Sequence, residues 1–365
     1  MSKYMSKPVL VIAAISARPY VQAAVNAGFE VIALDAFSDV DTQKLAQQCV
    51  QVKVKNGQFL ADKLLNALEN LSFDFFCYGA GFEAQPELLA QIEKRWALLG
   101  NSAKTVQMCK DPSQFFGICK ALSLPFPEFS LMPPTTTKDW LQKNIGGSGG
   151  AHIKVVLPLD LPADDAHFFQ KIQAGAPVSC FFLADGKQVQ IIGFNLQWCS
   201  PTLLLPYRFG GAVSHADLPK NVQEKIEAFI SKATPLLGLR GLNSADFLLQ
   251  DDDLFALEIN PRLSATLDCY RAKKGDLFAA HIATCQGESL PALTINKAAR
   301  AMQIVYANQP ILSVPPDLEW PDFVRDIPTA GSLILAGEPI CSVLAEARTP
   351  KLAQQKALQM AASLS

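Results

Sequence analysis

The sequence predicts a mixed α/β and α+β protein, with a parallel α/β domain at the N-terminus, a largely antiparallel region in the middle and a small β-rich portion at the C-terminus. Three observations predict this class. Residues 1–100 alternate short apolar runs with helical patterns, which is typical of a parallel sheet. Two later segments each join apolar runs through an aspartate-containing turn, and the end of the chain combines short strands with several prolines.

The composition limits the classes of protein to which this chain can belong. The chain has 365 residues, of which 49% are hydrophobic and 18% charged, as in ordinary globular proteins, so disordered and fibrous architectures are excluded. The formal net charge of -2 gives no field that would attract nucleic acid, and no apolar run reaches the length of a membrane span. We therefore expect neither a nucleic-acid nor a membrane partner.

The cysteines and the N-terminus indicate a cytoplasmic protein. The 9 cysteines are scattered through apolar surroundings without C-x-x-C spacing, which is typical of reduced core residues. Lys3 and Lys7 precede the apolar run Val9–Ile15 and so imitate a signal peptide. We favour a buried strand, because the run is short and the chain turns directly after it.

The first domain is expected over residues 1–105. Its predicted strands are Val9–Ile15, Val31–Leu34, Phe73–Tyr78 and Trp96–Leu99, and its predicted helices are Val21–Ala27, Phe59–Leu68 and Pro86–Lys94. A dinucleotide site would need G-x-G-x-x-G after the first strand, yet no glycine precedes Gly28. Asp35, at the end of the second strand, is at least as well explained as a turn residue. An oxidoreductase that uses a dinucleotide is therefore disfavoured.

A second domain is expected over residues 106–290, and a C-terminal portion over residues 291–365. The predicted elements are a helix from Asp111 to Lys120, a proline-rich linker from Pro125 to Pro134, a hairpin of Val178–Leu183 and Val189–Phe194, a helix from Asn221 to Leu237, a hairpin from Ala245 to Asn260 and a final helix. Local signals predict their ends. Asp111-Pro112 and Thr349-Pro350 begin helices, Gly238 ends one, and Asp185-Gly186 permits a tight hairpin turn.

The second hairpin carries the first candidate site. Centring its turn on Asp252 places Asp246 opposite Glu258, with Asn260 on the same face. The predicted core face consists of Phe247, Leu249, Phe255, Leu257 and Ile259. Opposed carboxylates destabilise a sheet, so a positive group is expected between them. Carboxylate and amide oxygens suit Mg²⁺ or Mn²⁺ bound with substrate phosphates, whereas a solvated acidic face is the alternative interpretation.

A glycine-rich loop supplies the second candidate site. Gly146-Gly147-Ser148-Gly149-Gly150 lies between two strand-like segments, and Lys143 precedes it. Small residues let backbone N–H groups approach phosphate oxygens, and the lysine adds a positive charge. Arg262, two residues after Asn260, is placed to reach the same phosphates. The motif G-x-x-x-x-G-K-[ST] is absent, which removes a P-loop, and a flexible hairpin tip is the alternative interpretation.

Taken in order, these motifs resemble the ATP-grasp superfamily of ATP-dependent carboxylate ligases. The resemblance rests on Lys143, the glycine-rich loop, the Asp-Gly hairpin, Asp246 and, most specifically, Glu258-Ile-Asn260-Pro-Arg262. It implies an ATP-grasp fold, and residues 1–100 are similar to the domain that usually precedes it. A narrower likeness, to an uncharacterised ATP-grasp group linked to one-carbon carrier metabolism, rests on Leu99-Gly-Asn-Ser102, Lys110-Asp-Pro112 and Asp322 to Pro328.

The resemblance implies a role for each matching residue. Asp246, Glu258 and Asn260 would hold Mg²⁺ or Mn²⁺, and Arg262 and Lys143 would act on the transferred phosphoryl group. The implied ATP contacts are Lys110, Lys143, Gly146, Gly147, Ser148, Gly149, Gly150 and, at the hinge that receives adenine, Gln170, Lys171 and Ile172. This sequence departs from the family pattern in three places: Lys110-Asp111 reverses the usual order, Asn144 replaces a common proline, and Ala151 interrupts the glycines.

Three further residues are candidates for the substrate site. Arg18 follows the first strand, where open α/β sheets present ligand groups, and would meet the carboxylate of the acceptor. A water-exposed residue in the first turn of a helix is an equally good interpretation. Tyr207 and Arg208 would face the acceptor cavity. The histidines, His152 among them, show no ligand spacing and are interpreted as ordinary residues.

The leading hypothesis is an ATP-dependent carboxylate–amine ligase that works through an acyl phosphate and releases ADP and phosphate, in small-molecule or cofactor biosynthesis. Its cofactors would be ATP and Mg²⁺, because phosphoryl transfer depends mainly on positioning and charge stabilisation. The expected partners are a small-molecule carboxylate and an amine, and homo-oligomer formation is left open. The alternative is an ATP-grasp-like nucleotide-binding module without turnover.

Overall fold

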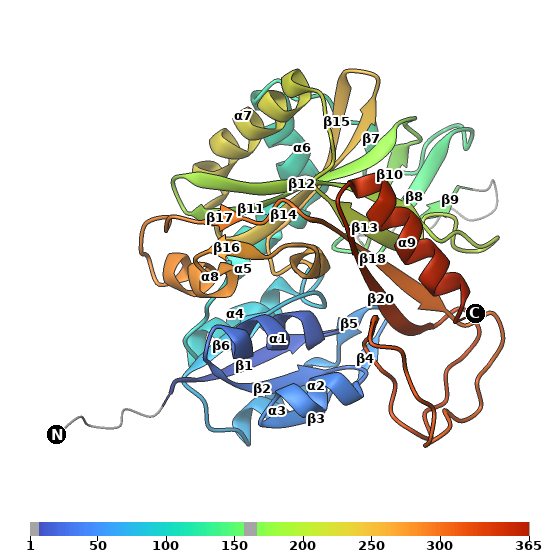
Figure 1. Cartoon of the computed structure of the whole chain (residues 1–365). Helices are drawn as coiled ribbons and strands as arrows, with labels where there is room; N and C mark the ends of the chain where they lie inside the picture. The colour runs from blue at the N-terminus through green and yellow to red at the C-terminus, as the bar shows by residue number, and fades with distance from the viewer. Residues whose placement is uncertain (1–6, 157–165, 365) are drawn as a thin grey trace.

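The structure is a computed structural model that describes residues 7–156 and 166–364. Figure 1 shows the N-terminal α/β domain at the bottom and a larger, mainly antiparallel part above it. The mixed α/β and α+β class predicted from the sequence is confirmed. Within these two ranges, no helix is both long enough and apolar enough to cross a membrane.

The N-terminal domain is built on a parallel sheet with the strand order β3-β2-β1-β6. Its elements are β1 (Val9–Ala14), α1 (Arg18–Asn26), β2 (Glu30–Asp35), α2 (Val40–Leu45), β3 (Gln48–Gln51), β4 (Val54–Lys55), β5 (Gln58–Phe59), α3 (Ala61–Glu69), β6 (Phe75–Tyr78) and α4 (Pro86–Arg95). β1 is buried along almost its whole length because it lies between two strands and under helices. The predicted strand Trp96–Leu99 is reduced to one bridge, between Phe76 and Leu98.

Two consecutive helices follow, α5 (Ala103–Lys110) and α6 (Pro112–Ala121). The side chains of Ser102 and Asp111 cap them, so α6 begins where the sequence predicted a helix. α5 was not predicted because its short sequence has little apolar periodicity. Its last residue, Lys110, is buried and points toward the large sheet.

A small antiparallel sheet carries the glycine-rich loop. Its strand order is β7-β10-β8-β9. The strands are β7 (Phe129–Ser130), β8 (Trp140–Asn144), β9 (Lys154–Val155) and β10 (His167–Lys171). The loop therefore lies between two strands, as the sequence predicted.

The largest sheet has eight strands among the described residues, in the order β15-β14-β11-β12-β13-β18-β20-β19. They are β11 (Ala176–Asp185), β12 (Val189–Cys199), β13 (Phe209–Ser214), β14 (Arg240–Gln250), β15 (Asp253–Asn260), β18 (Ala299–Tyr306), β19 (Val324–Arg325) and β20 (Pro339–Ala347). Both predicted hairpins are present, as β11/β12 and β14/β15. Because β13 pairs with β18, strands after residue 290 continue this sheet and cover an edge that would otherwise be unpaired. The predicted domain boundaries remain a prediction.

The remaining elements flank this sheet. They are α7 (Lys220–Leu237), η1 (Ala265–Cys269), β16 (Ala272–Lys274), α8 (Leu277–Cys285), β17 (Thr294–Ile295) and α9 (Pro350–Ala362). α7 ends at Gly238 in the left-handed conformation, and the Thr349 side chain caps α9, both as predicted.

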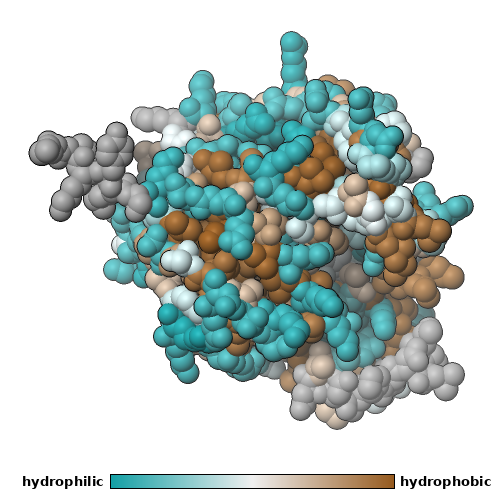
Figure 2. Space-filling view, turned by 90° about the horizontal axis from the view of Figure 1, so that it is seen from below, coloured by the Kyte–Doolittle hydropathy of each residue, from teal (hydrophilic) through white to brown (hydrophobic). Residues whose placement is uncertain are grey.

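Apolar packing joins the N-terminal domain to the large sheet. One core cluster contains Leu10 of β1, Phe181 of β11 and Phe278 of α8, all buried. This shared core holds the carboxyl ends of the parallel strands against the large sheet. Seen from below, the surface is largely hydrophilic, with apolar groups exposed in separate patches (Figure 2).

Candidate active site

A cavity of about 820 Å³ lies where the N-terminal domain, the glycine-rich loop and the large sheet meet. Of the predicted site residues, Arg208 alone is absent from its lining. Those that line it are Arg18, Lys110, Lys143, residues 146–150, Gln170, Lys171, Ile172, Tyr207, Asp246, Glu258, Asn260 and Arg262. Residues that are far apart in the sequence are thus brought into one site.

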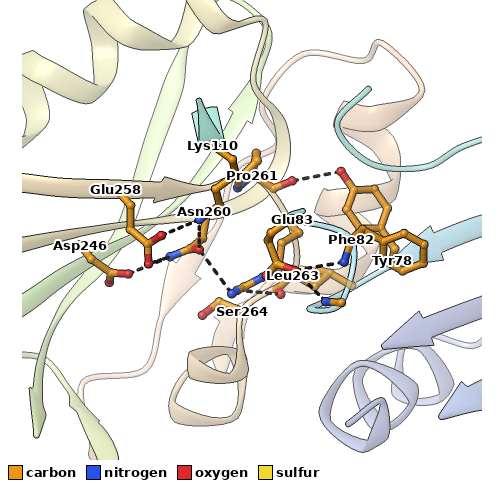
Figure 3. Close-up of polar contacts among 12 residues, drawn as sticks. Tyr78, Phe82, Glu83, Lys110, Asp246, Glu258, Asn260, Pro261, Leu263 and Ser264 are labelled. Carbon is orange, nitrogen blue, oxygen red and sulfur yellow. Dashed lines mark hydrogen bonds and ion pairs between the residues drawn. The ribbon is translucent and has the colours of Figure 1, made fainter. Parts of the chain in front are cut away.

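β14 and β15 bring the predicted metal ligands together. Asp246 pairs directly with Glu258, as predicted. Asn260 lies beside both, and its Nδ2 donates to Asp246 Oδ2 at 2.7 Å and to Glu258 Oε1 at 3.3 Å (Figure 3). The described residues contain no metal-binding group of three or more His, Cys, Asp or Glu side chains. An oxygen from Asn260 would therefore be needed to complete this set, and two carboxylates with one amide suit Mg²⁺.

The rest of the hairpin departs from the predicted register. Its turn is centred between residues 251 and 252, and a bulge next to Asp246 shifts the pairing by one residue. The prediction that Phe255 and Leu257 face the core was therefore wrong. Ala256 enters the core instead, while Leu257 lines the cavity. One extra residue in a strand exchanges its two faces, which the period-two pattern alone does not reveal.

Lys110 supplies the positive group that the opposed carboxylates require. Its Nζ lies 2.6 Å from Glu258 Oε2 and 2.7 Å from Asn260 Oδ1. Burial opposes ionisation of Glu258, but the Lys110 ammonium outweighs it and lowers the pKa of this carboxyl. Burial and the neighbouring Glu258 charge raise the pKa of Asp246. Asp246 is thus the ligand left without a full counter-charge, and a second cation beside it would be favourable.

Arg262 is held by a residue that the sequence did not reveal. Its Nε donates to Glu83 Oε1 at 2.9 Å, and both side chains are almost completely buried. Glu83 also accepts the N–H groups of Gly81 and Phe82, so its carboxylate is fixed on the loop after β6 (Figure 3). Burial opposes ionisation, but Arg262 lowers the pKa of Glu83. The position of Glu83 after a parallel strand is the feature of the sequence from which it could have been predicted.

The glycine-rich loop is packed between two other parts of the chain. A Cβ on Gly150 would lie 1.9 Å from Tyr207 O, and one on Gly146 would lie 2.5 Å from Ala84 Cα. Both glycines have positive φ. The loop also accepts the Phe209 N–H through Gly149 O at 3.0 Å. Glycine is therefore required at both ends of the loop for close approach as well as conformation.

Lys143 and Gln170 pair beneath this loop. Lys143 Nζ donates to Gln170 Oε1 at 2.6 Å, and burial lowers the pKa of the lysine to about 8. Gln170 is 1% exposed, and its Nε2 has no partner among the described residues. Of its predicted neighbours at the adenine hinge, Lys171 forms an exposed ion pair with Glu128, and Ile172 is 42% exposed.

His152 differs from its interpretation as an ordinary histidine because it lines the cavity. Its ring packs against Gly147, and its Nδ1 is buried without a partner in the described structure. Burial lowers the pKa of His152 to about 4, so the ring is neutral near pH 7. Its position two residues after the glycine-rich loop is the one signal that the sequence offered.

The three predicted substrate residues occupy different environments. Arg18 is 2% exposed and pairs with Asp268 and Asp326, so its interpretation as an exposed first-turn residue was wrong. Tyr207 lines the cavity. Arg208 instead stacks 3.6 Å from the ring centroid of Tyr306 and donates to backbone carbonyls. Its guanidinium is therefore used structurally.

Asp35 is a turn residue, as the simpler interpretation held. Its carboxylate accepts the N–H groups of Ala17, Phe37 and Ser38 at 2.6 to 2.7 Å. These bonds tie the end of β2 to the start of α1 and to the turn that follows β2, and no ligand is needed to explain the residue.

The Lys143→Ala substitution is expected to weaken ATP binding by about tenfold to a hundredfold, the effect of losing one charged hydrogen bond. Lys154→Ala, which removes an exposed ammonium from β9, should leave the affinity unchanged. Isothermal titration with ATP measures both. Unchanged affinity in Lys143→Ala would show that the phosphates bind elsewhere.

Comparison with known proteins finds relatives of this chain. Residues 110–266 match the family model described as ATP-grasp domain. An uncharacterized protein of Methanocaldococcus jannaschii is 23% identical over 366 residues, covering 91% of this chain and 86% of that protein. A D-alanine–D-alanine ligase of Nitratidesulfovibrio vulgaris is 30% identical over 154 residues, covering 37% of this chain and 51% of the ligase.

A solved structure shares the fold along almost the whole chain. The N5-carboxyaminoimidazole synthetase of Staphylococcus aureus, solved in complex with ADP, has a TM-score of 0.68 at 15% identity, and 99% of each chain is covered. This likeness shows a common fold.

Proposed function

Residues 110–266 form an ATP-grasp domain, and from that premise we propose that this chain is an ATP-dependent ligase that joins a carboxylate to an amine through an acyl phosphate. The observation that carries the proposal is that one cavity contains the hairpin carboxylates, two lysines, an arginine and the glycine-rich loop. We place the reaction in small-molecule or cofactor biosynthesis, because the expected substrates are a small carboxylate and an amine.

ATP fits the groups that line the cavity. The loop glycines offer backbone N–H groups, and Lys143 offers an ammonium beside them. The unpartnered Nε2 of Gln170 is a buried donor, for which a ring nitrogen of adenine is a suitable acceptor. His152 is neutral at pH 7 and therefore adds no positive charge beside the loop.

Mg²⁺ fits the hairpin because the hairpin brings together two carboxylates and an amide, and because Asp246 has no full counter-charge. Asp246, Glu258 and Asn260 would hold it, and when bound it would neutralise charge on the phosphates. Lys110 occupies the space between Glu258 and Asn260 in this structure. In the proposed reaction its ammonium turns from these ligands toward the phosphates, so that no positive charge is lost from the site.

The proposed reaction has two steps. A carboxylate oxygen of the substrate bonds to the γ-phosphorus of ATP while the bond to the bridging oxygen breaks and ADP leaves. The neutral amine then attacks the acyl carbon, the bond to phosphate breaks, and the nitrogen releases its extra proton. Arg262 and Lys143 stabilise negative charge on the transferred group, and no protein nucleophile is required.

Glu83 is proposed as a positioning residue for Arg262. We expect Glu83→Gln to lower kcat by about tenfold to a hundredfold, because the arginine loses a charged partner that fixes its direction. The KM for ATP should change little. The melting temperature should fall, because Arg262 is left buried without its counter-charge, so kcat is compared at a temperature where both proteins are folded. Glu83→Asp should restore part of kcat. A fall in melting temperature that accounts for the lost activity would show a purely structural role.

A screen for ADP release tests the proposed function. Purified protein, ATP and Mg²⁺ are mixed with pairs of carboxylates and amines, and mass spectrometry identifies any product. The proposal predicts ADP release that requires both members of one pair. ATP binding without ADP release in any pair would favour the alternative, a nucleotide-binding module without turnover.

A further inference from the structure

One end of the cavity is strongly acidic. We call the acidic lobe the part lined by Ser16, Arg18, Asp39, Asp268 and Asp326. It lies between the carboxyl ends of β1 and β2, η1 and the residues that follow β19. Its charged groups come from segments far apart in the chain, and Arg18 is the cation among them.

The acidic groups around this lobe have partners, with one exception. Asp268 and Asp326 both accept from the guanidinium of Arg18. Asp41 accepts the backbone N–H groups of Asp326 and Ile327 at 2.9 and 3.0 Å. These carboxylates therefore have structural roles that do not call for a ligand.

Asp39 is the exception. The residue is 4% exposed and lines the cavity, and its Oδ2 is buried with no hydrogen-bond partner in the described ranges. It stands at the N-cap of α2, yet its side chain makes no capping bond. A buried carboxyl without a partner is costly, so the fold by itself gives no reason for an aspartate at this position.

Among the described residues, Arg18 is the one cation that acts on Asp39, and it does not balance the carboxylates around that residue. Burial, followed by the charges of Asp326, Asp35 and Asp41, raises the pKa of Asp39 to about 9, and Arg18 opposes this only in part. The thiols of Cys49 and Cys341 also face it. In these surroundings the Asp39 carboxyl therefore keeps its proton near pH 7, and a positively charged hydrogen-bond donor beside it would favour the ionised form.

We propose that the acidic lobe recognises an ammonium group of the substrate, with the Asp39 carboxylate as its direct partner. The proposal rests on the proposed function, since it assigns a chemical class to one substrate of the same cavity. An ammonium group brings three N–H donors and one positive charge, which satisfies the orphaned oxygen of Asp39 and offsets the excess of carboxylates. A carboxylate or phosphate at this position would be repelled.

Binding of benzylammonium, with benzyl alcohol as its neutral counterpart, tests this assignment. Both are titrated into the full chain without ATP, and binding is followed by saturation-transfer NMR and calorimetry. Wild type should bind benzylammonium in preference to the alcohol, and Asp39→Asn should weaken that binding by about tenfold or more. Asp62→Asn, an exposed carboxylate on α3, should bind as wild type does.

Three outcomes overturn the proposal: equal binding of benzylammonium by Asp39→Asn and wild type, equal binding of the alcohol and the ammonium by wild type, or no saturable ammonium binding at all. Because ATP is absent, these results do not depend on turnover. Failure of the ADP-release screen with intact ammonium binding would instead contradict the proposed function and leave the lobe assignment standing.

The pH dependence of stability gives a second readout. The pKa of Asp39 is raised in the folded state, so the unfolded chain releases this proton first and stability falls as pH rises from the ordinary aspartate value toward about 9. Asp39→Asn removes that loss. Its melting temperature should therefore exceed that of wild type by a margin that grows between about pH 5 and 8. A constant or reversed margin would show that Asp39 has a partner in solution.

Discussion

Glu258→Gln is expected to abolish ADP formation, by about a thousandfold or more, because it removes one of the two carboxylates proposed to hold the metal and the phosphates in place. The side chain keeps its shape, so the loss reports on charge. The measurement is steady-state ADP release with Mg²⁺-ATP and the substrate pair found in the screen. Asp246→Asn, on the opposed strand, should have a comparable effect.

Asp252→Asn is the matched control. It removes one negative charge from the same hairpin, at the exposed turn, and should leave turnover unchanged. The two site variants should also differ in stability. Glu258 is paired with Lys110, so Glu258→Gln should lower the melting temperature somewhat. Asp246→Asn removes a carboxyl whose pKa is raised in the folded state, so it should raise the melting temperature near pH 7. Full activity in Glu258→Gln, or equal damage in Asp252→Asn, would place the metal elsewhere.

Arg18→Met is expected to lower the free energy of unfolding by about 3–5 kcal/mol, because it leaves buried carboxylates without their cation. Arg18 is 3% exposed in its side chain, and its partners Asp268 and Asp326 are 11% and 16% exposed. It joins α1, η1 and the residues after β19, so its loss separates three parts of the chain. Urea unfolding measures the effect.

Arg95→Met is the control for this substitution. Arg95 pairs with Glu69 at 2.7 Å, but both side chains are nearly half exposed, so the loss should stay within about 1 kcal/mol. If Arg18→Met were as stable as Arg95→Met, the Arg18 cluster would be mobile or solvated rather than a junction. In that case Arg18 would also not hold Asp268 and Asp326 in fixed positions in the acidic lobe.

The hairpin shows what the sequence could predict. The pairing of Asp246 with Glu258 was predicted, but through two departures that cancel: the turn is centred before Asp252, and the bulge next to Asp246 then shifts the register by one residue. The turn signal and the period-two pattern could not place the bulge, which depends on how the sheet packs, so the core face near the turn was predicted wrongly. The need for a positive group between the carboxylates was predicted from charge alone, while its source in Lys110 depends on how α5 packs on β15.

Other site residues were beyond sequence reasoning for a related reason. Glu83 and Asp39 lie in loops of the N-terminal domain, and their partners or lack of partners arise from contacts with segments far along the chain. A single sequence shows that such residues follow parallel strands, but it does not show which of them are buried. Arg18 was recognised by its position after β1, and its burial by Asp268 and Asp326 became visible in the structure.

The path of oxygen from substrate to phosphate distinguishes ligation through an acyl phosphate from other uses of ATP. The carboxylate that supports ADP release is labelled with ¹⁸O, and the phosphate formed is examined by ³¹P NMR and mass spectrometry. Ligation through an acyl phosphate predicts that each phosphate carries one ¹⁸O atom from the carboxylate, in step with ADP and amide formation. Phosphate without the label, or AMP in place of ADP, would contradict an acyl-phosphate intermediate.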